Sequence, residues 1–128
     1  MRILIVVHGL PNDRVTLHLS AQLAHQAGAA ITVLAVAGHA RDRARFDPAL
    51  AQAREVLALA PGLESKVRLG SPVHEVVREI QENGYDLVLV GEPWHEGLFG
   101  RFRPGSESVH LVEHAPCSVL IVKGQPRA

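Results

Sequence analysis

The chain has 128 residues, with 13 basic and 13 acidic side chains, 47% hydrophobic residues and a single cysteine, Cys117. This length suits one domain that folds without a disulfide or metal staple, and one cysteine excludes an internal disulfide. Balanced charge argues against nucleic-acid and anionic-membrane partners. We see no secretory leader or run of about 18 apolar residues, so we expect a cytoplasmic protein, with one domain over residues 1–128.

Short apolar segments alternate with amphipathic ones along the chain. Nearly continuous apolar runs are typical of strands that are buried on both faces, as in a parallel sheet. Four such runs and one weaker candidate occur, at residues 3–7, 31–36, 66–69 (the weaker one), 87–90 and 119–122.

Helix signals fill the gaps between these strands. Asp13 can cap a first helix that ends at Gly28, and Ser71 can cap another that begins at Pro72 and ends at Asn83-Gly84. Two further helices are expected over about 48–59 and 106–114. The resulting β-α-β-α-β-α-β-α-β order predicts an α/β fold, an open parallel sheet with helices on both faces.

The loop after the fourth strand is the most informative segment for chemistry. Ligands of open α/β sheets bind beyond the carboxyl ends of the strands. This loop is rich in glycine, leads into a helix start, and carries the hydroxyls of Ser106 and Ser108. It is therefore a candidate phosphate cradle, although it matches neither the P-loop nor the dinucleotide fingerprint. A surface loop before a serine-capped helix is the alternative.

Several segments together resemble the universal stress protein family over essentially the whole chain. They are ILIVVHG at 3–9, GAAITVLAV at 28–36, GSP at 70–72, YDLVLVG at 85–91, the loop to Gly105-Ser106, and HAPCSVLIV at 114–122. The resemblance implies an adenine-nucleotide-alpha-hydrolase-like fold with five parallel strands in the order 3-2-1-4-5. It also implies a homodimer that pairs the last strands, and, in some members, bound ATP.

The family's nucleotide motif is only partly present. Members that bind ATP have an acidic residue at the end of strand 1 and a G-x2-G-x9-G-[S/T] loop after strand 4. Gly91, Gly105 and Ser106 match, but His8 occupies the acidic position, Trp94 the second glycine, and the run is one residue longer. A neutral imidazole accepts one hydrogen bond, and an indole obstructs close backbone approach unless it stacks on a base. We therefore expect weakened binding of ATP or another adenine nucleotide.

The resemblance and the loop pattern together define a set of candidate nucleotide-contacting residues. Val36 belongs to it because the strand 2 backbone of the family meets the adenine there, and Gly97 and Gly100 because they permit a different loop path. The full set is His8, Gly9, Val36, Gly91, Trp94, Gly97, Gly100, Gly105, Ser106 and Ser108.

Eight histidines are many for this length. His8, His39 and His95 follow three strands that the family order makes neighbours, so they are candidate metal ligands, or three unrelated loop histidines. His110 and His114 share one helix face, which we interpret as a solvated polar face. His18, His25 and His74 are expected on helix surfaces.

A non-catalytic stress-response or regulatory module is the favoured function. The alternative is a weak ATPase or metal-assisted hydrolase that uses the His8, His39 and His95 rim, but no nucleophile, base and orienting partner can be assembled. We therefore assign no catalytic residue. Homodimerisation is expected through the apolar last strand, which no later element covers; its apolar residues are Val119, Leu120, Ile121 and Val122.

Overall fold

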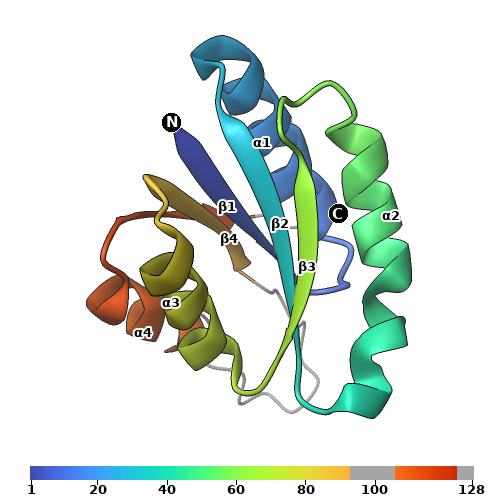
Figure 1. Cartoon of the computed structure of the whole chain (residues 1–128), viewed down its shortest axis with the longest axis vertical. Helices are drawn as coiled ribbons and strands as arrows, with labels where there is room; N and C mark the ends of the chain where they lie inside the picture. Colours follow the sequence, from blue (N-terminus) through green and yellow to red (C-terminus); the bar gives the residue numbers. More distant parts are fainter. Residues whose placement is uncertain (93–105, 124–128) are drawn as a thin grey trace.

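A five-stranded parallel sheet forms the centre of the molecule (Figure 1). The computed structural model describes residues 1–92 and 106–123. The strands are β1 (Arg2–Val7), β2 (Ala30–Ala37), β3 (Glu64–Leu69), β4 (Leu87–Glu92) and β5 (Ser118–Lys123). Their order is β3-β2-β1-β4-β5, and every pairing is parallel. The predicted fold class and strand order are confirmed.

Among the residues that the structure describes, four α-helices and one 3-10 helix connect the strands. They are α1 (Asp13–Ala27), the 3-10 helix η1 (Ala40–Phe46), α2 (Asp47–Val56), α3 (Pro72–Asn83) and α4 (Ser106–His114). The 3-10 helix η1 lies in a segment for which the sequence predicts no strand or helix, and α2 ends three residues before the predicted end. Within the described part of the chain, no helix is both long enough and apolar enough to cross a bilayer.

The helix ends follow the expected glycines but not the expected side-chain caps. Gly28 and Gly84 adopt positive φ values of 64° and 72° at the ends of α1 and α3, as predicted. Asn12 precedes α1 as the capping residue, and Asp13 lies inside the helix, so the predicted Asp13 cap is wrong. The Ser71 hydroxyl also makes no capping hydrogen bond, while its carbonyl accepts one from the Glu75 N–H at 2.9 Å.

Two apolar layers cover the sheet. On one face, alternate residues of β1 and β2, including Ile5 and Val33, pack with Leu17 of α1 and Leu50 of α2. On the other face, Leu4, Val6 and Leu34 pack with residues of α3 and with Leu111 of α4. Figure 1 shows α3 and α4 together on the side of the sheet opposite α2. Burial on both faces explains the continuous apolar runs of the strands.

A buried carboxylate joins α3 to the edge strand β3. Glu79 is 1% exposed and accepts hydrogen bonds from Lys66 at 2.8 Å, Arg68 at 2.8 Å and the Tyr85 hydroxyl at 2.8 Å. Asn83 donates a fourth at 2.9 Å. Burial alone would raise the pKa of Glu79, but these donors outweigh it and the pKa is lowered. Glu79 is therefore a charged group inside the fold with its hydrogen bonds satisfied.

Candidate functional site

The carboxyl ends of β1 and β4 meet where the strand order reverses, which is the ligand-binding crevice of an open α/β sheet. β1 is followed by His8, whose Nε2 lies 3.2 Å from the carbonyl oxygen of Gly91 in β4. A carbonyl can only accept, so Nε2 is the donor and carries the proton. The imidazole therefore bridges the two strands on either side of the crevice.

The loop after β1 is held by an internal carboxylate. Asp13 accepts a hydrogen bond from the Gly9 N–H at 2.8 Å, and the His8 N–H lies 3.0 and 3.2 Å from its two oxygens. Asp13 is 2% exposed, and Gly9 adopts a φ of 76° that lets the loop turn toward it. Because a carboxylate already uses these two backbone donors, they are not available to a phosphate.

Gly91 has a packing role of its own. A Cβ at this position would lie 2.7 Å from Oγ1 of Thr16 in α1, which is too close for any side chain. Thr16 is buried, and among the described residues its hydroxyl has no hydrogen-bond partner. The glycine that matches the nucleotide motif is thus also required for α1 to approach β4.

Two arginines surround a hollow beside the β1 loop. The hollow has a volume of about 490 Å³, lies between this loop and the start of α2, and includes Gly9, Asp13, Arg14 and Arg45 in its lining. Arg14 and Arg45 are exposed, and the Asp13 carboxylate accepts hydrogen bonds from two backbone N–H groups. The hollow could therefore receive the negative charge of a phosphate group. The sequence places the two arginines in separate segments and gives no signal that both line one hollow.

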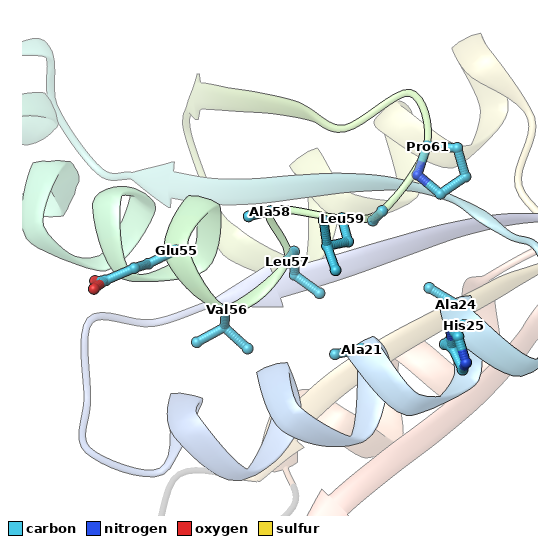
Figure 2. A pocket seen from close by; sticks show the side chains of 10 residues that line it. Ala21, Ala24, His25, Glu55, Val56, Leu57, Ala58, Leu59 and Pro61 are labelled. Carbon is cyan, nitrogen blue, oxygen red and sulfur yellow. The ribbon is translucent and has the colours of Figure 1, made fainter.

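A second hollow lies at the opposite end of the sheet. Figure 2 shows its lining, with Ala21 and Ala24 of α1 facing Val56 and Leu57 near the end of α2, and its volume is about 480 Å³. The lining is largely apolar and contains His25 and Glu55 as its titratable side chains. It contributes nothing to the crevice between β1 and β4, because the last turns of α1 and α2 lie near the amino ends of the strands.

A model of the universal stress protein family matches residues 1–123 of the chain. The chain belongs to this family. No sequence among curated proteins matches it.

Solved universal stress proteins share the fold. Universal stress protein UspA from Lactobacillus plantarum superposes with a TM-score of 0.80 at 23% identity, covering 96% of this chain and 97% of that one. A universal stress protein in complex with cAMP superposes with a TM-score of 0.80 at 20% identity, covering 98% of each chain. A universal stress protein from Archaeoglobus fulgidus in complex with dAMP superposes with a TM-score of 0.72 at 17% identity, covering 96% of this chain and 98% of that one. At these identities the likeness establishes the fold.

The described residues contain part of the nucleotide set inferred from the family. His8, Gly9 and Gly91 lie together at the crevice, and Val36 is the half-buried penultimate residue of β2. Ser106 and Ser108 lie in the first turn of α4. The remaining members fall outside the described residues, namely Trp94, Gly97, Gly100 and Gly105.

The proposed histidine rim is only partly visible. His8 is half-buried after β1, and His39 is exposed before η1, while His95 lies outside the described residues. Within the described residues, neither His8 nor His39 belongs to a group of three side chains close enough to share a metal ion.

Cys117 is half-buried at the entry to β5, and burial raises the pKa of its thiol, which disfavours the reactive thiolate.

Proposed function

We propose that this universal stress protein is a non-catalytic stress-response or regulatory module that binds an adenine nucleotide weakly at the crevice between β1 and β4. The proposal rests on family membership and on two ligand-bound structural neighbours, one with cAMP and one with dAMP. The weak affinity is argued from the hydrogen bond that His8 Nε2 donates to the Gly91 carbonyl oxygen.

In neutral His8 this bond leaves Nδ1 as the one acceptor for a ribose hydroxyl or an adenine amino group. An aspartate at the same position would offer two oxygens that accept several bonds. A ligand that needs more acceptors leaves donors unpaired in the complex, which costs about 1–3 kcal/mol for each buried group. Arg14 and Arg45 supply the compensating charge for phosphate, so monophosphates and longer phosphates should bind better than adenosine.

Isothermal titration calorimetry with cAMP, AMP, ATP and adenosine tests the proposal. We expect dissociation constants of about 100 μM or weaker, and a loss of the preference for phosphate in the Arg14→Ala/Arg45→Ala variant. Low-micromolar ATP binding contradicts the weakened site, and no binding at millimolar concentration contradicts nucleotide binding altogether. Phosphate release above the enzyme-free rate contradicts the non-catalytic assignment.

The homodimer belongs to the same proposal. β5 pairs with β4 on one side, and the described residues place no strand on its other side. Leu120 is 37% exposed on this edge, and Val119 and Ile121 are partly exposed. An apolar free edge favours pairing with the same strand of a second copy.

A further inference from the structure

We infer that the last turn of α4 carries a site for a zinc-type dication, formed by His110, Glu113 and His114. The ligand atoms of these three side chains all lie within 4.8 Å of one another. The site is separate from the nucleotide crevice and does not depend on it, because the last turn of α4 leads into the amino end of β5, whereas the crevice lies beyond the carboxyl ends of β1 and β4.

The helix places these groups for a shared ion. Residues four apart on a helix have Cβ atoms about 5–6 Å apart on one face, so two imidazoles at this spacing can reach the same ion. Glu113 is three residues after His110 and adds a carboxylate oxygen. All three side chains are exposed, so small rotamer changes can bring their ligand atoms to the spacing of about 3.3 Å required by bonds of about 2.0 Å around zinc.

Two features of the surroundings favour a cation. The last turn of α4 carries the negative end of the helix dipole, and Glu113 contributes a formal negative charge. Arg78 of α3 lines the groove next to His110 and His114, but it pairs with Glu82 at 3.2 Å and lies 3.7 Å from Glu75. Its charge is therefore directed to carboxylates of its own helix.

The chemistry of the donors selects the metal. Two neutral imidazole nitrogens and one carboxylate oxygen suit Zn²⁺ and neighbouring first-row metals better than Mg²⁺ or Ca²⁺, which prefer oxygen. Three protein ligands leave a fourth coordination position for water or for His74 of α3, which lines the same groove of about 650 Å³. This arrangement is that of an accessible ion rather than a closed structural site.

Equilibrium dialysis of the full, metal-free chain against Zn²⁺ at pH 7.5 tests the inference. We expect about one ion per chain, and at least about tenfold weaker binding in His110→Gln and in His114→Gln. Glu113→Gln should weaken binding less, because it removes the charge but keeps an oxygen. Co²⁺ substitution gives a second readout, since a four-coordinate site has intense visible absorption bands that vanish in His110→Gln/His114→Gln.

The matched control is His18→Gln/His25→Gln, which removes two exposed histidines that lie seven residues apart on α1. It should bind Zn²⁺ like the parent chain. Unchanged binding in His110→Gln/His114→Gln, or loss of binding in His8→Gln/His39→Gln instead, overturns the site on α4. So does the absence of binding to the parent chain below millimolar Zn²⁺. Because the substituted side chains are exposed, circular dichroism and thermal unfolding should match the parent, and cAMP titration should be unaffected.

Discussion

The Nε2 atom of His8 lies 3.2 Å from the carbonyl oxygen of Gly91, which joins the ends of β1 and β4 across the crevice of the sheet. The imidazole therefore lies just beyond the paired ends of the two strands, at the crevice where an open α/β sheet binds its ligand. His8, which replaces the family's acidic residue, thus links β1 to β4 as well as being a candidate ligand contact.

His8→Asp should tighten binding of adenine nucleotides by about tenfold, because a carboxylate accepts several charge-assisted hydrogen bonds where the imidazole accepts one. Calorimetric titration with cAMP and ATP measures the change. His25→Asp on α1 adds the same charge at an exposed position away from the crevice and should leave the affinity as it is. Equal affinities for His8→Asp and the parent would remove His8 as the cause of weak binding.

Asp13→Ala should destabilise the domain by about 1.5–3 kcal/mol, since hydrogen bonds to a charged, buried acceptor are worth that much and two backbone donors lose their partner. Urea unfolding followed by circular dichroism gives the free energy. Glu55→Gln, which removes an exposed charge from α2, should lie within about 0.5 kcal/mol of the parent. A similar small effect for Asp13→Ala would show that the loop does not need this carboxylate.

Glu79→Gln should lower the free energy of unfolding by about 2 kcal/mol, because it removes the buried negative charge to which Lys66, Arg68 and Tyr85 donate hydrogen bonds. The pKa of Glu79 is lowered, so its contribution is present above the unfolded value of about 4.3 and is lost as the pH falls through the lower folded value. Urea midpoints measured from pH 3 to pH 7 should therefore fall more steeply on the acid side for the parent than for Glu79→Gln. Parallel profiles for the two chains would contradict the assignment.

Tyr85 makes the stability of the fold depend on pH at alkaline pH. Burial raises the pKa of Tyr85, so the folded state holds its proton more tightly than the unfolded state does. This contribution is present below about pH 10 and is lost as the pH rises through the folded pKa. Tyr85→Phe should flatten the stability profile above pH 10, and ultraviolet titration of the phenol follows its ionisation directly.

Gly91→Ala should destabilise the fold by about 1–3 kcal/mol, because the new methyl group meets Thr16 Oγ1 at 2.7 Å. Thr16→Ala in the same chain should recover part of this loss by removing the atom that is hit. Double-mutant analysis of urea unfolding measures the coupling. Additive changes in the free energy of unfolding would show that α1 moves away from the new methyl group. The packing against Thr16 would then not explain the glycine at position 91, and ligand binding would remain as the reason for it.

We proposed a homodimer through β5, so the parent chain should be dimeric and Leu120→Asp should be monomeric, as measured by light scattering across a range of protein concentrations. Leu120 is the appropriate site because it is exposed, whereas Val119 packs against the core on the α3 and α4 face and its substitution could unfold the chain. Leu69→Asp places a charge on the exposed residue of the other edge strand and serves as the control. Dimers that persist in Leu120→Asp would place the interface elsewhere.

Periodicity and glycine positions were sufficient to predict the strands and most helix ends, since strand burial and left-handed turns leave local signals. The partners that each polar side chain contacts in the fold were not predictable in the same way. Asp13 has the spacing of a helix cap, yet its carboxylate accepts hydrogen bonds from the backbone N–H groups of His8 and Gly9, and Asn12 precedes the helix. Likewise, Arg14 and Arg45 line one hollow only because α2 packs beside α1, and this packing depends on the whole fold.

The two edges of the sheet differ in the chemistry they offer to another chain. β3 carries Lys66 and Arg68, which are bound to carboxylates of α3, while β5 carries exposed leucine between half-buried aliphatic residues. Strand addition at the charged edge would bring these cations against a second copy, so the sheet can extend from one side. Association between like edges closes after two chains, whereas association between unlike edges would propagate into a filament. In the proposed homodimer, the ion pairs that attach α3 would therefore also limit the size of the assembly.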